Sequence, residues 1–141
     1  MKLVDTNILV YAVDSDSRYH KQSSRWIEDT LVTESGMALA WLGLVGFVRL
    51  ATRKGILNKP LPVADALAMV QDWLGHPNSH ILHPGERHAD IFARLLLVAG
   101  AAGNLTNDAH LAALAIEHNA EMVSFDRDFK RFSGLKFHHL S

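Results

Sequence analysis

The sequence predicts an α/β fold with a mostly parallel central sheet of four to five strands, covered by helices on both faces. Short apolar segments of strand length alternate with longer segments whose apolar residues recur at helical spacing. This alternation is typical of parallel sheets whose crossover connections are helices. The chain has 141 residues, 48% of them apolar, which suffices for one core, so we expect a single domain over residues 1–141.

The first predicted strand ends at an acid. Leu3 and Val4 belong to a short apolar run that stops at Asp5, and a helix is predicted over residues 7–13. A strand buried on both faces has such an uninterrupted apolar sequence. Because ligands of open parallel sheets bind beyond the carboxyl ends of the strands, we expect Asp5 at that edge. The alternative is that Asp5 only caps the helix, by accepting a backbone N–H group.

The middle of the chain continues the alternation. The predicted elements are helices over residues 20–31, 41–53 and 64–74, and strands over residues 37–40 and 79–82. The helix over residues 41–53 is apolar nearly all round, so it is either buried or covered by a partner. Gly43 and Gly46 in this helix permit another backbone to approach closely, at some cost in helix propensity.

The last part of the chain carries further acids beside predicted strand and helix ends. The predicted elements are a helix over 86–99, a loop over 100–104, a helix over 109–118 opened by Thr106, Asn107 and Asp108, a strand over 121–124 and an edge strand over 136–140. Asp126 and Asp128 directly follow the strand over 121–124. Right-handed crossovers bring the carboxyl ends of parallel strands to one rim, so we expect Asp5, Asp108, Asp126 and Asp128 to share it.

Carboxylates gathered on one rim predict a site for a hard divalent cation. Mg²⁺ prefers oxygen ligands and is usually held by one or two carboxylates together with substrate phosphate. Several carboxylates close together repel one another unless a cation offsets their charge or some are protonated. Each acid also has a simpler interpretation. Asp108 is favoured at a helix start by the helix dipole, and Asp126 and Asp128 are common turn residues.

Composition excludes several other classes of site and of protein. The chain has no cysteine, so it forms neither disulfides nor thiolate metal sites. Its nine histidines lack the usual zinc spacing, since Pro77 separates His76 from His80 and the pair His138 and His139 is consecutive. A net charge of −1 implies that any contact with nucleic acid is local or assisted by cations. Without a membrane-length apolar run or signal peptide, we expect a soluble, cytoplasmic protein.

Four stretches, in order and at suitable spacing, resemble the PIN-domain nucleases and in particular the VapC toxins of bacterial toxin–antitoxin pairs. The stretches are residues 3–7 (LVDTN), 46–52 (GFVRLAT), 108–115 (DAHLAALA) and 123–129 (VSFDRDF). The resemblance covers essentially the whole chain. It implies a compact three-layer α/β/α sandwich and an endoribonuclease that uses Mg²⁺ or Mn²⁺ and cleaves RNA phosphodiester bonds by attack of water. It also implies a homodimer held by a VapB-like antitoxin.

The resemblance assigns roles to particular residues. It makes Asp5, Asp108 and Asp126 catalytic metal ligands, and Asp128 an accessory ligand. Two polar residues match positions that support the site, namely Asn7 and Ser124. Candidates for phosphate contacts, with a solvated basic surface as the alternative, are Arg49, Arg53, Lys54, Arg127, Lys130 and Arg131.

One departure from the family pattern concerns a glutamate on the helix after the second strand. Residues 41–53 contain no acid, and Val45 or Gly46 stands at the expected position. The number of cations therefore stays open, as does whether Asp128 or a remote acid such as Glu34 substitutes.

Two other functions are alternatives to the nuclease. A domain disabled by the missing glutamate would still bind RNA or a partner, and it would bind Mg²⁺ without turnover. A phosphatase with Asp5 as nucleophile typically carries a second acid two residues later, where Asn7 stands.

The helices around residues 41–52 and 67–74 have more apolar surface than a small core needs, which favours a groove for an amphipathic antitoxin helix. Ordinary core packing is the alternative for these helix faces. The sequence carries no pattern that identifies the RNA substrate.

Overall fold

The computed structural model of the chain describes residues 1–100, 103 and 105–141. Apart from residues 100 and 103, the predicted loop over 100–104 lies outside the described residues. Within the described residues, no helix has both the length and the apolar character that crossing a membrane requires.

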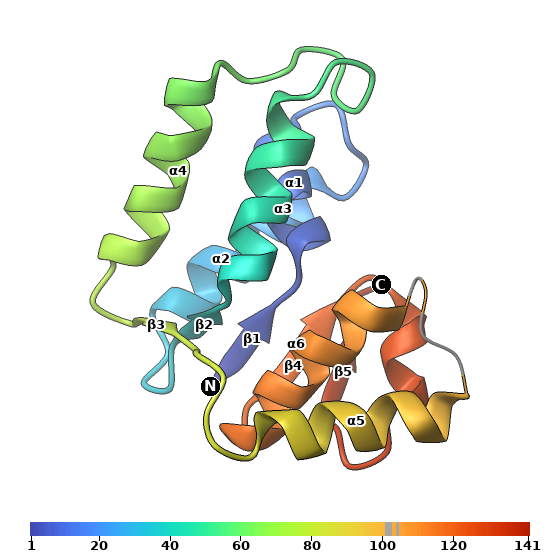
Figure 1. The fold of residues 1–141 in the computed structure, drawn as a ribbon. Helices are drawn as coiled ribbons and strands as arrows, with labels where there is room; N and C mark the ends of the chain where they lie inside the picture. Colours follow the sequence, from blue (N-terminus) through green and yellow to red (C-terminus); the bar gives the residue numbers. More distant parts are fainter. Residues whose placement is uncertain (101–102, 104) are drawn as a thin grey trace.

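The strands of the described residues form one five-stranded sheet in the order β3-β2-β1-β4-β5 (Figure 1). The strands are β1 (Lys2–Val4), β2 (Met37–Leu39), β3 (Ser79–Ile81), β4 (Glu121–Ser124) and β5 (Phe137–His139). Every neighbouring pair is parallel. The predicted parallel sheet is therefore confirmed, and the last strand lies at an edge, as predicted.

The helices lie close to their predicted positions. They are α1 (Thr6–Val13), α2 (His20–Leu31), α3 (Trp41–Thr52), α4 (Val63–Gly75), α5 (His88–Ala99) and α6 (Leu105–Glu117), with a 3₁₀ helix η1 (Arg127–Arg131). The prediction for α6 was wrong at its start, because the helix begins at Leu105 and not at Ala109. Leu105 is buried, and its packing extends the helix by about one turn. Asp108 therefore lies inside the first turn of α6.

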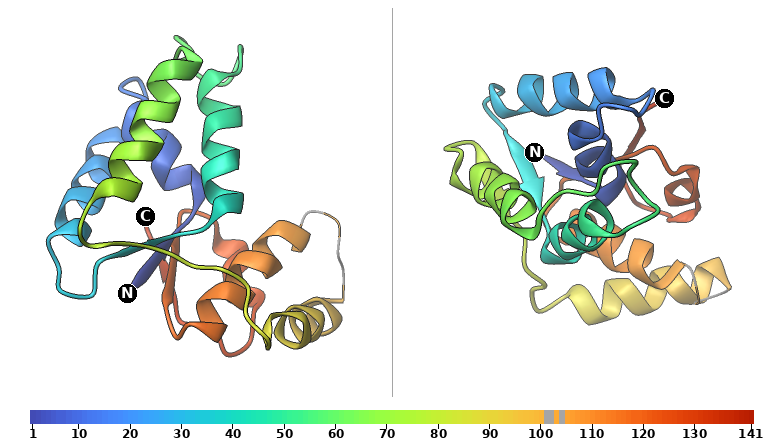
Figure 2. Two further views of the ribbon diagram at one scale, coloured as in Figure 1. Left: turned by 60° about the vertical axis from the view of Figure 1, so that its left-hand side comes forward. Right: turned by 90° about the horizontal axis from the view of Figure 1, so that it is seen from above.

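Two layers of helices cover the sheet, which confirms the predicted three-layer α/β/α sandwich (Figure 2). Neighbouring strand residues point to opposite faces. Leu3 packs in the core beneath α5, α6 and η1, whereas Val4 packs in the core beneath α1, α2, α3 and α4. Seen from above, α2 and α5 run along opposite sides of the molecule.

Helix α3 lies against the start of α1, as its two glycines predicted. Thr6 Oγ1 donates a hydrogen bond to the carbonyl oxygen of Gly43 over 3.0 Å. A Cβ atom on Gly46 would lie 3.0 Å from Thr6 Oγ1. The contact brings α3 to the carboxyl end of β1, where Asp5 lies.

The strand order reverses between β1 and β4. From β1 the chain adds β2 and β3 on one side, and it then returns to place β4 and β5 on the other side. The crevice at such a switch point is the usual ligand-binding position of open parallel sheets. The backbone N–H of Asp5 donates to the carbonyl oxygen of Val123 over 3.0 Å, so Asp5 lies beside the end of β4.

Candidate functional site

Asp5 is a buried carboxylate held by two hydrogen bonds at the end of β1. Its side chain is 9% exposed. Oδ1 accepts from the backbone N–H of Thr6 over 2.8 Å, and Oδ2 accepts from the hydroxyl of Ser124 over 2.6 Å. Asp5 therefore also caps α1, as the simpler interpretation held. Burial raises the pKa of Asp5, while the hydrogen bonds from Ser124 and Thr6 act in the opposite direction.

Ser124 joins three parts of the site through one fully buried hydroxyl group. While donating to Asp5, its Oγ accepts from Asn7 Nδ2 over 3.1 Å and from the backbone N–H of Asp126 over 2.9 Å. A hydroxyl has one donor and two acceptor positions, and all three are used here. The network fixes the ends of β1 and β4 relative to α1.

Asp108, Asp126 and Asp128 form the open side of the site. One carboxylate oxygen from each lies within 4.8 Å of the other two. Burial raises the pKa of Asp108 to about 7, and the charges of Asp5, Asp126 and Asp128 add to the shift. Asp126 also caps η1, since its Oδ1 accepts from the backbone N–H of Asp128 over 2.9 Å.

These carboxylates fit a hard divalent cation by the chemistry of their donor atoms. The oxygens converge from α6 and from the segment after β4, and Asp108 is held where its charged form is disfavoured. A cation would offset that cost. The only ion pair in the described residues that involves one of these acids is Arg131 with Asp128, at 3.7 Å. Both side chains of this pair are more than half exposed, so it offsets little of the charge.

A cleft of about 400 Å³ opens beside the acids, between α3 and α6. Its lining includes Asp5, Asp108 and Arg49. Among the predicted phosphate contacts, the structure places only Arg49 in this cleft. Arg53 is exposed at the end of α3 and does not line it. Arg127 is exposed on the other side of the acids and lines a different pocket.

The position at which the family carries a glutamate faces this cleft, but no acid stands there. Val45 and Gly46 both line it. Asp128, one of the two predicted substitutes for this glutamate, lies near Asp108 and Asp126. The other suggestion, Glu34, was wrong, because this exposed residue precedes β2 and lies at the amino ends of the strands.

An apolar groove of about 370 Å³ runs between α3 and α4. Trp41, Val45 and Leu67 line it and are 50%, 60% and 47% exposed. The predicted excess of apolar surface on these helices is therefore confirmed. Val45 and Arg49 line both this groove and the cleft beside the acids, so the two depressions are continuous.

Sequence reasoning missed a further pocket, whose lining is partly aromatic. It contains Tyr11, Tyr19 and Phe125. Tyr11 lies one helical turn beyond Asn7, and Phe125 lies between Ser124 and Asp126. This closeness to the predicted site residues is the signal that was available.

Comparison with known proteins gives consistent matches over nearly the whole chain. A family model for the PIN domain matches residues 2–135. Ribonuclease VapC37 of Mycobacterium tuberculosis is 49% identical over 137 residues, which cover 97% of this chain and 95% of the relative. Ribonuclease VapC33 of the same organism is 43% identical over 137 residues, covering 97% and 96%.

Solved structures of similar proteins share the fold. VapBC2 from Rickettsia felis, bound to a DNA fragment from its promoter, matches with a TM-score of 0.71 and 20% identity, covering 99% of this chain and 98% of that chain. VapC20 of M. tuberculosis, described as a sarcin-ricin loop cleaving toxin, matches with a TM-score of 0.69 and 14% identity, covering 96% and 99%.

Proposed function

Because this chain belongs to the PIN-domain family, together with the VapC ribonucleases, we propose that it is the toxin of a type II toxin–antitoxin pair and a metal-dependent endoribonuclease. One observation carries the proposal. Asp108, Asp126 and Asp128 meet within 4.8 Å beside the buried Asp5, at the switch point of a parallel sheet. Relatives that cover almost the whole chain are named ribonucleases. That naming disfavours both the binding-only module and the phosphatase.

In the proposed mechanism Asp108, Asp126 and Asp128, with Asp5 beside them, would hold Mg²⁺ or Mn²⁺. When bound, the cation supplies activation of water and offsets the charge that develops on the phosphate. Ser124 and Asn7 keep Asp5 oriented through the hydrogen bonds described above. Arg49, which lines the cleft beside Asp108, binds a phosphate of the RNA strand. Attack by water leaves a 5′-phosphate and a 3′-hydroxyl.

The proposal includes a VapB-like antitoxin that binds the α3–α4 groove. Several solved relatives of the same fold are toxin–antitoxin complexes. An amphipathic helix would cover Trp41, Val45 and Leu67, whose apolar surface is otherwise in contact with water. Since Val45 and Arg49 belong to both the groove and the cleft, a bound helix would also restrict access to the acids. We further propose one domain over residues 1–141, a homodimer and a cytoplasmic location.

The test is cleavage of total cellular RNA by purified protein without antitoxin. We expect discrete fragments with Mg²⁺, no cleavage with EDTA, and no cleavage by Asp108→Asn. End-group analysis of the fragments would check the 5′-phosphate. Cleavage that persists in EDTA, or that Asp108→Asn retains in full, would contradict the metal-dependent mechanism.

A further inference from the structure

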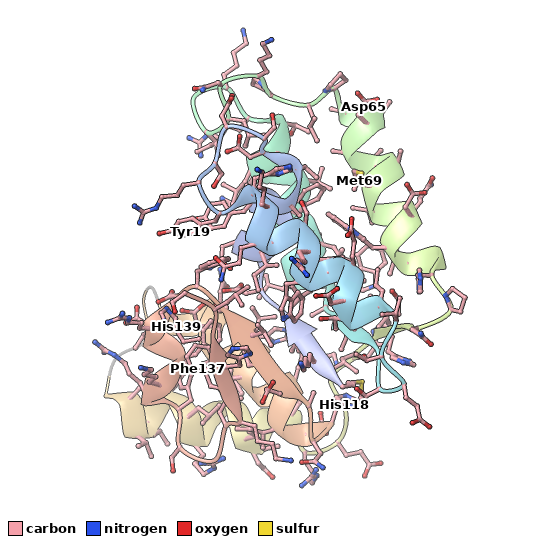
Figure 3. All side chains as sticks on the ribbon, turned by 180° about the vertical axis from the view of Figure 1, so that it is seen from behind. Tyr19, Asp65, Met69, His118, Phe137 and His139 are labelled. Atoms are coloured by element: carbon pink, nitrogen blue, oxygen red, sulfur yellow. The ribbon has the colours of Figure 1, made fainter. Side chains whose placement is uncertain are left out.

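A pocket of about 500 Å³ lies beside the acids, on the α1 and β5 side of the molecule. The residues that line it include Tyr11, Arg18, Tyr19, Phe125, Arg127 and His139. They come from α1, the α1–α2 connection, the segment after β4, and β5. In Figure 3, seen from behind relative to Figure 1, Tyr19 and His139 lie near one another on the same side of the molecule.

We propose that this pocket binds an unpaired base of the RNA substrate, one or two nucleotides from the phosphate that is cleaved. This inference rests on the proposed nuclease function and adds to it the part of the surface that distinguishes single-stranded from paired RNA. Three features of the pocket support it: aromatic rings, positive charge and its position relative to the acids.

The aromatic rings form a compact and partly exposed cluster. The ring centroid of Tyr19 lies 5.2 Å from that of Tyr11 and 4.8 Å from that of Phe125, and the Tyr11–Phe125 distance is 5.2 Å. None of the three side chains is fully buried. Unpaired bases of RNA stack on aromatic side chains and on arginine planes, whereas bases inside a duplex are stacked on each other and unavailable.

The charged side chains that line the pocket are opposite in sign to the neighbouring acids. The guanidinium carbon of Arg18 lies 4.7 Å above the centroid of the Tyr19 ring, and Arg18 also hydrogen-bonds the Tyr19 hydroxyl. Arg127 is a second exposed cation in the lining. None of the described residues that line the pocket is Asp or Glu. In a chain with a net charge of −1, this local positive charge suits the phosphates on either side of a stacked base.

The pocket is joined to the acids through Phe125. This residue lies between Ser124 and Asp126 in the chain, and its backbone N–H donates to Asn7 Oδ1 over 3.5 Å. The cleft that contains Arg49 opens on the α3 and α6 side, whereas this pocket opens on the α1 and β5 side. A strand with its scissile phosphate at the acids would therefore extend toward Arg49 on one side and toward Tyr19 on the other.

The experiment measures base stacking directly and separately from cleavage. The probe is a single-stranded RNA oligonucleotide that contains the fluorescent base 2-aminopurine, with the same sequence in a duplex for comparison. Binding is measured in EDTA, where stacking quenches the fluorescence without turnover. We expect quenching of the single strand and not of the duplex. Tyr19→Leu, which removes the ring, should weaken binding about tenfold, whereas Tyr19→Phe should bind within about twofold of the unmodified protein.

Charge variants and a matched control complete the test. Arg18→Ala and Arg127→Ala should each weaken binding several-fold, while Arg25→Ala, an exposed arginine on α2 paired with Asp29, should have no effect. In cleavage assays Tyr19→Leu should raise KM more than it lowers kcat. Thermal unfolding of each variant shows whether the fold is retained.

The possible outcomes separate this inference from the proposed function. Tyr19-dependent quenching by a protein that cleaves no RNA would retain the base pocket and overturn the nuclease. Cleavage without any effect of Tyr19→Leu on quenching or KM would overturn the base pocket alone. If Tyr19→Leu weakens binding of a VapB-like antitoxin and leaves RNA binding unchanged, the pocket is a protein contact and the inference is wrong.

Discussion

Two parts of the acidic site are held in different ways. Around Asp5 and Ser124 every hydroxyl and carboxylate oxygen named above has a hydrogen-bond partner, and both side chains are buried. Around Asp108 the acids lie close together, and burial, together with the neighbouring charges, raises the pKa of Asp108 to about 7. The hydrogen bonds around Asp5 and Ser124 are satisfied within the protein. The negative charge around Asp108 is not offset by the protein itself. Substitutions in the two parts should therefore have different consequences for stability.

The largest expected effect is loss of RNA cleavage, and we expect it from a substitution in either part of the site. Asp5→Asn should abolish cleavage with the fold intact, as should Asp108→Asn. Loss of a direct electrostatic contact at a reacting centre costs about 10³-fold in rate, and initial rates on the mapped RNA substrate would measure it. Circular dichroism would verify folding. Full activity in Asp5→Asn would remove Asp5 from the proposed metal ligands.

Ser124→Ala tests the hydrogen-bonded part. The substitution leaves Asn7 Nδ2 and the backbone N–H of Asp126 without their acceptor, and Asp5 Oδ2 without its donor. Unsatisfied buried polar groups cost about 1–3 kcal/mol each, so we expect a loss of about 2 kcal/mol in the free energy of unfolding. Urea denaturation measures it, with the exposed Ser133→Ala as control. Equal stability of the two variants would show that the network does not hold the strand ends.

The carboxylates around Asp108 predict that the stability of the folded protein falls as the pH rises. Burial and the neighbouring carboxylates raise the pKa of Asp108 from its ordinary value of 3.8 to about 7 in the folded protein. Because the folded pKa is raised, its stabilising contribution is fully present below pH 4 and is lost as pH rises through about 7. In EDTA at pH 8, Asp108→Asn should be more stable than the unmodified protein by about 1 kcal/mol, after discounting for partial exposure.

Thermal unfolding of both proteins in EDTA between pH 5 and pH 8 measures this effect. The difference between them isolates Asp108, since His110, whose pKa is lowered by burial and by His88, titrates in both. Added Mg²⁺ should stabilise the unmodified protein and leave Asp108→Asn nearly unchanged. A stability difference that does not vary with pH would mean that Asp108 is not held in its disfavoured charged state.

The same contrast explains what could be predicted from the sequence. Strands and helices followed from local spacing, and the shared rim followed from the rule that parallel strands end at one edge. The hydrogen bonds of Ser124 join residues 117 and 119 positions apart, which no local pattern encodes. The early start of α6 depends on burial of Leu105, a property of the folded core. Phe125 likewise meets Tyr11 and Tyr19 only in the folded protein, where α1 packs against β4.

The smallest expected effect separates two arginines of one helix. Arg49 lines the cleft beside Asp108, whereas Arg53, about one turn further along, does not. Arg49→Ala should raise KM several-fold, and it should reduce the dependence of RNA binding on log salt concentration by about 0.7, the value for one phosphate contact on a single strand. Arg53→Ala, the matched control, should change neither quantity by more than about a fifth of that amount. Fluorescence anisotropy in EDTA at several salt concentrations measures the slopes. Equal slopes for the two variants would mean that the basic end of α3 acts as a diffuse charged surface, and that the strand does not enter the cleft at Arg49.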